Sequence, residues 1–184
     1  MAQQEAPKQT EKRSAKVDAM VDAMADFVLE NGLTAASLRP LAKAAGTSDR
    51  MLLYYFADKH ELMAAILERV ADRMVAMLDA IADSEPMSPD ALLTALMPLL
   101  SSDLAWPFMR IWIALASEGA NGDSNAQNVG KRLGQRFLKW GKGRLIGADE
   151  AERHKEASRM LVMIEGQVML KALGLEQIGK DALG

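Results

Sequence analysis

One short segment carries the residues whose types and spacing best suit recognition of a ligand. Within residues 48–56, Leu52 and Phe56 recur at the i and i+4 spacing of a buried helix face. An arginine near the start of such a helix can read guanine edges, a tyrosine can reach a phosphate, and a leucine can meet a thymine methyl group. The segment therefore predicts a helix that enters the major groove of DNA, with four outward side chains: Asp49, Arg50, Leu53 and Tyr54.

Catalytic and metal-binding chemistry has no comparable set of residues in this sequence. There is no cysteine, and the two histidines, His60 and His154, stand far apart without convergent partners. The acidic cluster 149–152 is typical of a helix start, where carboxylates complement the helix dipole. We therefore expect no enzyme activity, no metal and no cofactor.

Two short helices must position the outward face, and the sequence supplies the turn between them. Ser37 and Ser48 stand where they can cap the segments 37–45 and 48–56. Gly46 can take the left-handed turn conformation that other residues resist. The layout predicts a helix-turn-helix at about residues 37–56, although two ordinary core helices explain this pattern equally well. In either case the inward side of the first segment is formed by Leu38, Leu41, Ala42 and Ala45.

The flanks of this segment favour the helix-turn-helix, because together with it they resemble the TetR family of bacterial regulators. The resemblance extends over residues 15–70. It implies an all-α fold in which a three-helix N-terminal helix-turn-helix domain joins an antiparallel helical C-terminal domain, with about nine helices in all. The implied partners are double-stranded operator DNA, a second copy of the chain in a homodimer, and a small hydrophobic effector. The matching residues are Gly32-Leu-Thr34, Leu41-Ala42, Ala45-Gly46, Ser48, Leu52-Leu-Tyr-Tyr-Phe56 and Asp58-Lys59-His-Glu61-Leu62.

The same resemblance assigns DNA contacts position by position. Lys59, which opens the fourth helix, is expected to hold a phosphate together with that helix's N-terminal amides.

Two residues depart from the family pattern. At the position of Asp49 the family often has Lys or Arg. An acid beside phosphates is unfavourable unless it accepts from a cytosine amine or pairs with Arg50. Met51 also departs, because the family often has a small residue or Thr there. The expected DNA-contacting residues are Ser37, Arg39, Ser48, Asp49, Arg50, Leu53, Tyr54, Tyr55 and Lys59.

The charge balance restricts how this chain can bind DNA. The net charge is −3, and residues 1–62 contain eight Lys and Arg against nine Asp and Glu. Binding must therefore come from the placement of single cations rather than from a broadly basic surface. Asp18, Asp22, Asp26 and Glu30 recur at i+4 intervals and predict a solvated acidic face that points away from DNA.

The succession of helical patterns divides the chain into three parts. We expect a mobile polar arm over 1–14, the DNA-binding domain over 15–58, and a helical effector-binding and dimerisation domain over 59–184. The first helix, about 15–30, should end at Asn31-Gly32. Asp58 should cap a helix that runs to about residue 83, with Ile81 on its buried face. Further helices are expected at about 89–100, from 102 or 103 to 118, at 126–146 and at 149–173.

The sequence shows neither a signal peptide nor a run of eighteen apolar residues. We therefore expect a cytoplasmic protein without membrane contact.

Aromatic and methionine side chains of the C-terminal part predict either a pocket for an apolar or aromatic effector or plain core packing. Arg110 and Glu118 flank this apolar set and can serve as polar anchors or as surface charges. The candidate lining comprises Met74, Met77, Met97, Trp106, Phe108, Met109, Arg110 and Trp112.

The last predicted helix is apolar all round at residues 160–164, so we expect a second copy of the chain to cover the side that the chain's own core leaves open. A row of glycines, Gly130, Gly134 and Gly141, would let a partner helix approach closely. The candidate dimer interface comprises Gly134, Phe137, Gly141, Met160, Ile164, Gly166 and Val168.

Charged residues near this helix leave two alternatives open. Glu165, set among apolar residues, is expected either to pair across the dimer with a cation such as Arg159 or Arg136 or to point to water. The basic run 131–144 is interpreted as a solvated face rather than as a DNA or membrane contact.

Together these observations predict a sequence-specific DNA-binding regulator, a dimeric repressor that a small apolar or aromatic effector releases from its operator. The alternative is a DNA-binding protein of the same fold without such an effector, which responds to a protein partner or acts architecturally. A third class, an enzyme or a helical interaction module, has no supporting constellation of residues.

Overall fold

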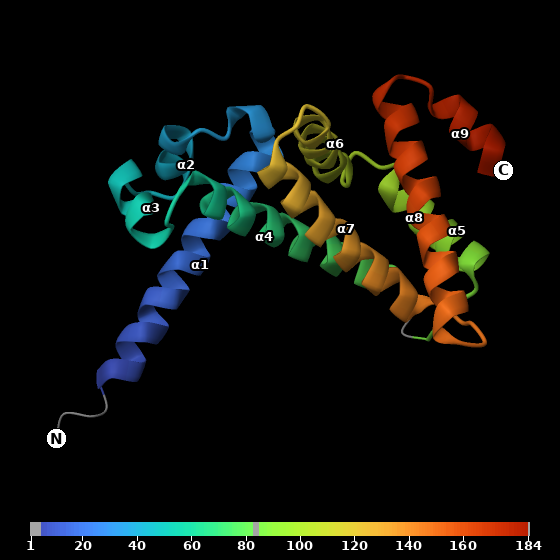
Figure 1. Cartoon of the computed structure of the whole chain (residues 1–184), viewed down its shortest axis with the longest axis horizontal. Coiled ribbons are helices and arrows are strands. Elements are labelled where there is room, and N and C mark those ends of the chain that lie inside the picture. Colours follow the sequence, from blue (N-terminus) through green and yellow to red (C-terminus); the bar gives the residue numbers. More distant parts are fainter. Residues whose placement is uncertain (1–4, 83–84, 184) are drawn as a thin grey trace. The chain divides into compact units, whose positions relative to one another are not determined.

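In the computed structural model, the described residues, 5–82 and 85–183, are almost entirely helical. Over these ranges the one extended pairing is a single bridge between Met87 and Leu145. The all-α prediction is therefore confirmed. The elements are α1 (Glu5–Asn31), a 3-10 turn η1 (Leu33–Ala35), α2 (Leu38–Ala44), α3 (Asp49–Tyr55), α4 (Lys59–Asp79), α5 (Pro89–Leu100), α6 (Trp106–Ala120), α7 (Ser124–Arg144), α8 (Glu150–Ala172) and α9 (Glu176–Leu183) (Figure 1).

The chain folds into two compact units, Met1–Val70 and Ala71–Gly184. The first contains α1, η1, α2, α3 and the first half of α4. Its core forms because each of these helices has an apolar stripe at helical spacing, which is removed from water when the stripes meet. The fully buried side chains of this core are Met24, Val28, Leu41, Leu52, Leu62 and Ile66.

The ends of the helices in the first unit follow their local sequence. The backbone N–H of Gly32, with φ 82°, donates to the Val28 carbonyl at 2.8 Å and ends α1, as predicted. Gly46 has φ 61° and turns the chain between α2 and α3. Ser48 caps α3 by accepting from the Met51 amide at 3.3 Å. Ser37 holds the corresponding position before α2, but its side chain makes no capping hydrogen bond.

Helix α1 begins ten residues earlier than predicted. It starts at Glu5 rather than near Ala15, so residues 5–14 are helical rather than a mobile arm, and residues 1–4 lie outside the described residues. The segment lacks apolar periodicity, which is why the sequence pattern missed it. It is nevertheless rich in Ala, Glu, Gln and Lys, which favour helix, and Pro7 falls in the first turn, where proline is tolerated.

Other boundaries differ for local reasons. Helix α4 ends at Asp79, short of the predicted residue 83, so Ile81 lies in a turn and is 40% exposed rather than buried. Helix α6 begins at Trp106 rather than at Ser102, because the Ser102 hydroxyl accepts from the Ala105 amide at 3.3 Å and forms a separate turn. Residues 83–84, where the end of the long helix was predicted, are outside the described residues.

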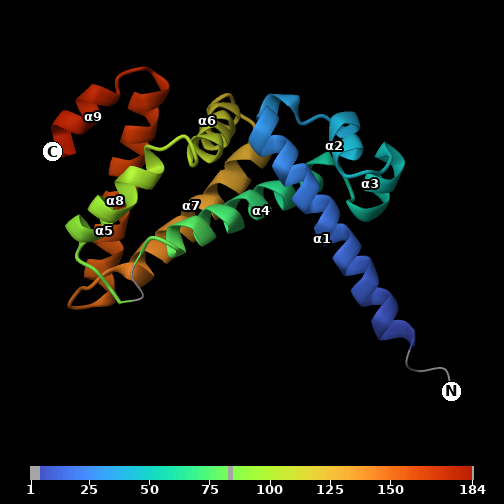
Figure 2. The same ribbon diagram turned by 180° about the vertical axis from the view of Figure 1, so that it is seen from behind.

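The second unit contains the end of α4 and helices α5 to α9, with α7 lying beside α6 and α8 (Figure 2). The glycine row of α7 explains this close packing. A Cβ placed on Gly134 would lie 3.8 Å from Cη2 of Trp112 on α6, and one on Gly141 would lie 3.8 Å from Cβ of Ala157 on α8. The row therefore faces helices of its own chain. These intrachain contacts were not expected from the sequence, which assigned the row to a dimer contact.

Helix α9 was not expected from the sequence. It packs on α8 through Gly179, whose carbonyl accepts from Nε2 of Gln167 at 2.9 Å. A Cβ at this position would lie 1.7 Å from Oε1 of Gln167, so any larger residue would displace the Gln167 amide from its hydrogen bond with the Gly179 carbonyl. Glycine inside a helix weakens the sequence signal for that helix, which accounts for the omission.

Candidate nucleic-acid interface

Helix α3 presents one buried and one exposed face. Leu52 is fully buried and Phe56 is 6% exposed, as the spacing predicted. Leu53 and Tyr54 are 47% and 62% exposed. The two apolar side chains predicted to face outward on α3 are therefore on its solvent-exposed face. Asp49 and Arg50, in the first turn of α3, are exposed as well.

The two tyrosines at the end of α3 form a cluster with a cation that sequence reasoning missed. The ring centroids of Tyr54 and Tyr55 are 5.2 Å apart, with the ring planes at 76°. The guanidinium of Arg13, on α1, lies 5.2 Å from the Tyr54 centroid and 5.6 Å from the Tyr55 centroid. Arg13 stands seven residues before buried Met20, on the same face of α1, and that spacing was the available signal.

The remaining predicted contact residues of the first unit are also on its surface. Ser37, Arg39, Ser48 and Lys59 are exposed, and Tyr55 is half-buried. Helices α2 and α3 pack against each other, which brings Arg39 and the α3 face into one helix-turn-helix.

The start of α4 carries acids as well as Lys59. The Glu61 amide donates to Oδ1 of Asp58 at 2.8 Å, and the Ala57 amide donates to Oε2 of Glu61 at 2.5 Å. This arrangement is a variant of the capping box in which the Ala57 amide replaces that of the N-cap residue, and it confirms that Asp58 caps the helix. It also occupies the Glu61 amide, one of the N-terminal amides that the sequence analysis assigned to a phosphate.

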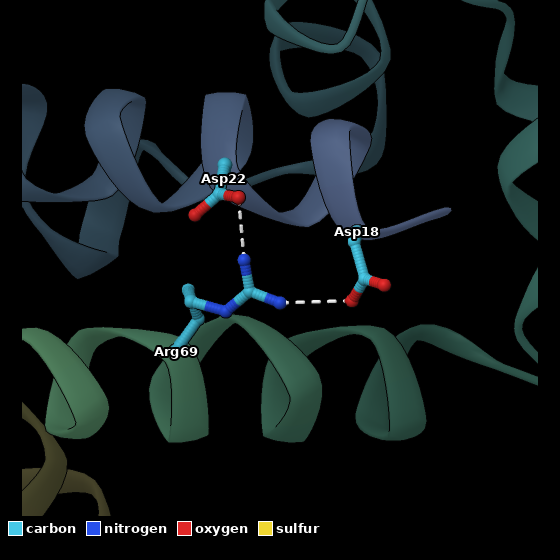
Figure 3. A network of polar contacts seen from close by, with 3 residues as sticks. All are labelled: Asp18, Asp22 and Arg69. Carbon is cyan, nitrogen blue, oxygen red and sulfur yellow. Dashed lines mark hydrogen bonds and ion pairs between the residues drawn. The ribbon is translucent and has the colours of Figure 1, made fainter. Parts of the chain in front are cut away.

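Within the first unit, an arginine of α4 forms ion pairs with two aspartates of α1 (Figure 3). Nη2 of Arg69 lies 2.9 Å from Oδ1 of Asp18, and Nη1 lies 2.5 Å from Oδ2 of Asp22. The hydrogen bond with Asp22 is the main cause that raises the pKa of Arg69. The predicted acidic face is therefore not simply solvated, because two of its four carboxylates hold a cation.

The candidate effector lining of the second unit divides into core and surface. Met74 is buried, and Met77, Phe108 and Met109 pack against the same apolar cluster, which agrees with core packing. Arg110 and Glu118 are exposed rather than turned into the apolar set. The half-buried Trp106 lies 4.8 Å from Nζ of Lys171, which also donates to the Ser101 carbonyl at 2.6 Å. Met97, on α5, is also half-buried.

A polar group that does contact an aromatic side chain of this set is Glu165. Its Oε2 accepts from Nε1 of Trp112 at 2.6 Å, a contact between α8 and α6. Burial is the main cause that raises the pKa of Glu165, and the Trp112 hydrogen bond partly offsets it. Within the single chain, Glu165 thus has an indole N–H as a partner, a contact that the sequence analysis did not anticipate.

Three cations of the basic run of α7 form ion pairs, while Lys131 and Lys139 are exposed. Arg136 pairs with Asp72, Arg144 lies 2.6 Å from Asp79, and Lys142 lies 2.6 Å from Glu150. The same Asp79 accepts from Nε1 of Trp140 at 2.6 Å. That hydrogen bond, helped by Arg144, lowers the pKa of Asp79.

The candidate dimer residues are mostly internal to the chain. Met160 and Val168 are buried, while Phe137 and Ile164 pack against the apolar cluster of the second unit. Gly166 alone among them is exposed, and a Cβ added there would meet nothing within 4 Å. The apolar side chains that α8 leaves exposed are different ones: Val162, Met163, Met169 and Leu173.

Within the part of the chain that the structure describes, no group of three His, Cys, Asp or Glu residues is arranged to hold a metal ion. None of the described helices combines the length and apolar character needed to cross a bilayer.

The chain is similar to known regulators in sequence and in structure. Residues 21–66 match the family described as "Bacterial regulatory proteins, tetR family". The HTH-type transcriptional regulator PksA of Bacillus subtilis (strain 168) is 24% identical over 166 residues, which cover 85% of this chain and 78% of PksA. A putative TetR-family transcriptional regulator from Rhodococcus sp. has a TM-score of 0.72 at 19% identity, covering 92% of this chain and 95% of that one.

A third likeness is to the transcriptional regulator FadR from Bacillus subtilis, solved in complex with stearoyl-CoA. Its TM-score is 0.56 at 15% identity, and the match covers 91% of this chain and 95% of FadR. The likeness to the solved structures spans both units, so the family fold extends well beyond residues 21–66.

Proposed function

Because this chain is a member of the TetR family of bacterial regulators, we propose that it binds operator DNA by placing α3 in the major groove. The observation that carries this proposal is the division of α3, where Leu52 is fully buried while Leu53 and Tyr54 are exposed. Arg50, in the first turn, is placed to read a guanine edge, since recognition helices contact bases through their N-terminal residues.

The flanking contacts are to the DNA backbone. Arg39 on α2, Tyr55 on α3 and Lys59 at the start of α4 are assigned to phosphates, and Ser37 and Ser48 to hydrogen bonds at the two helix starts. Because the capping box occupies the Glu61 amide, the phosphate contact at α4 rests mainly on the Lys59 side chain. Asp49 remains the unfavourable member of the set, and a cytosine amine is its natural partner.

Operator recognition requires two copies of α3 about one DNA turn apart, and we assign dimerisation to an apolar stripe on α8. Val162, Gly166, Met169 and Leu173 follow the i, i+4, i+7, i+11 spacing of one helix face. Val162 is 72% and Leu173 is 64% exposed in the single chain. A second copy that covers this stripe would remove the apolar surface from water.

Release from DNA is assigned to a small apolar or aromatic effector bound in the second unit, beside the Trp112–Glu165 hydrogen bond. A half-buried carboxylate among aromatic and methionine side chains is the group there that can orient a ligand. This proposal is supported by FadR, a regulator of similar fold that was solved in complex with stearoyl-CoA, whose acyl chain is apolar. A DNA-binding protein of the same fold without an effector is the competing proposal.

The DNA-binding proposal is tested by fluorescence anisotropy on the DNA upstream of the gene that encodes this chain. Arg50→Ala should weaken binding by about tenfold or more, since a good base contact is worth about 1–3 kcal/mol. Tyr54→Ala should also weaken binding, through the loss of a contact to the DNA backbone. Arg132→Ala, which removes an exposed arginine of α7, is the matched control and should bind like the wild type. Wild-type affinity in both α3 variants would refute the assignment.

Dimerisation and effector binding need separate measurements. Met169→Glu should yield monomers in sedimentation velocity, whereas Gln135→Glu, at an exposed position of α7, should leave the dimer intact. A dimeric Met169→Glu protein would rule out the α8 stripe as the dimer interface.

Thermal-shift screening of apolar and aromatic compounds should find ligands whose stabilising effect is lost in Trp112→Phe. A screen without any such ligand would favour the effector-free alternative.

A further inference from the structure

We propose that Arg13 is an additional DNA-contacting residue whose guanidinium, seated on the rings of Tyr54 and Tyr55, binds a backbone phosphate beside α3. The inference rests on the proposed function in one respect, namely that α3 enters the major groove. Arg13 lies outside the segment 21–66 that matches the family, and it belongs to the early part of α1 that the sequence pattern did not predict as helix.

The position of Arg13 follows from the register of α1. The face that buries Met20 and Met24 in the core of the first unit continues toward the N-terminus, and two turns before Met20 it reaches Arg13. At this point α1 has passed the core, so its inward face no longer meets apolar side chains. It meets the end of α3 instead, where the two tyrosine rings lie.

The contacts of Arg13 leave its hydrogen-bonding groups available. Among the residues whose side chains the structure describes, its partners are the two aromatic rings, through cation–π contacts at 5.2 and 5.6 Å, and none of them is a carboxylate. Such contacts use the face of the guanidinium and leave its N–H edge to donate. A planar edge of N–H donors matches the geometry of a phosphate.

The location favours a phosphate over a base edge. Recognition helices read bases mainly with their N-terminal residues, whereas Tyr54 and Tyr55 are the last two residues of α3. The end of the helix therefore faces the backbone that borders the groove. Tyr54 is 62% exposed and Arg13 is exposed as well, so solvent reaches both residues of this cluster.

The excess of acidic over basic residues in the DNA-binding part of the chain makes each single cation important for DNA affinity. Residues 1–62 contain more acids than bases, so a single correctly placed cation contributes a large share of the attraction to DNA. Arg13 adds a fourth cation to Arg39, Arg50 and Lys59, and it is the one whose side chain is held in place by aromatic rings.

The test is the salt dependence of binding, measured by fluorescence anisotropy on a mixed-sequence duplex and on the DNA upstream of the chain's own gene. Each phosphate contact contributes about 0.9 to the slope of log K against log salt, so Arg13→Gln should reduce the slope of a dimer by roughly 2 and weaken binding on both duplexes. Arg13→Lys keeps the charge and should recover most of the slope. Lys139→Gln, which removes an exposed charge of α7, should leave the slope unchanged.

Three outcomes would overturn the proposal. Arg13→Gln could keep the affinity and slope of the wild type while Tyr54→Ala still loses binding. It could weaken binding without changing the slope, which would make Arg13 a support for the rings only. Arg13→Lys could behave like Arg13→Gln although both variants melt like the wild type. Wild-type protein that binds neither duplex would instead refute the proposed function itself, so the two failures are distinguishable.

Discussion

Replacing Gly46 with alanine isolates the conformational requirement of the helix-turn-helix. A Cβ at this position would meet nothing within 4 Å, so no steric clash contributes. The cost is that of holding alanine at φ 61°, about 1–2 kcal/mol. The substitution also lowers the conformational entropy of the unfolded chain, which stabilises the folded state by about 0.4–1 kcal/mol. Gly46→Ala should therefore destabilise the protein by about 1 kcal/mol and lower Tm by roughly 2–4 °C for a chain of this size.

A matched substitution elsewhere in the chain should have the opposite sign. Gly143 is the second-last residue of α7, and a Cβ there also meets nothing within 4 Å. Because its backbone is helical, Gly143→Ala should stabilise the protein by roughly 0.5–1 kcal/mol. Gly46→Asn should recover part of the loss at Gly46, since asparagine tolerates the left-handed region.

The assay is thermal unfolding followed by circular dichroism at one fixed protein concentration, because oligomerisation makes Tm depend on concentration. Shifts of the same sign for Gly46→Ala and Gly143→Ala would refute the reasoning. So would a Gly46→Asn protein that is less stable than Gly46→Ala.

Two further predictions concern the polar contacts between helices. Arg69→Met removes both ion pairs with Asp18 and Asp22, which are partly exposed. It should therefore cost about 1 kcal/mol in chemical unfolding at low salt and less at high salt, and an equal cost at both salt concentrations would contradict the electrostatic account. Because burial raises the pKa of Glu165, this residue contributes most stability below its unfolded-state pKa, near 4.3, and loses that contribution as pH rises through the raised value. Glu165→Gln, whose carbonyl can still accept from Trp112, should thus be more stable than the wild type at pH 8, with the advantage shrinking toward pH 4. A constant difference across this range would show that ionisation of Glu165 is not the cause.

The sequence predicted the parts of this molecule that depend on local patterns. The burial of Leu52 and Phe56 follows from helical spacing, and the turn at Gly46 follows from the conformational freedom of glycine. These features are determined within a few residues, so periodicity and capping rules reach them.

What the sequence did not predict depends on residues far apart in the chain. The Trp112 and Glu165 side chains are 53 positions apart, and nothing in either local segment indicates that they meet. The α7 glycines were assigned to a partner molecule, whereas the helices that they face belong to the same chain. In both cases the periodicity identified a surface that must be covered, but only the tertiary fold determines what covers it.

The two carboxylates that hold Arg69 also restrict how α1 can turn about its own axis. Asp18 and Asp22 are one helical turn apart, about 6 Å along the axis, and both meet the same guanidinium. Rotation by the angle of a single residue, about 100°, would carry both carboxylates away together. Arg13 lies five residues beyond Asp18, roughly 7.5 Å further along, so the rotational phase set by Arg69 also determines whether Arg13 points at the tyrosine rings or away from them.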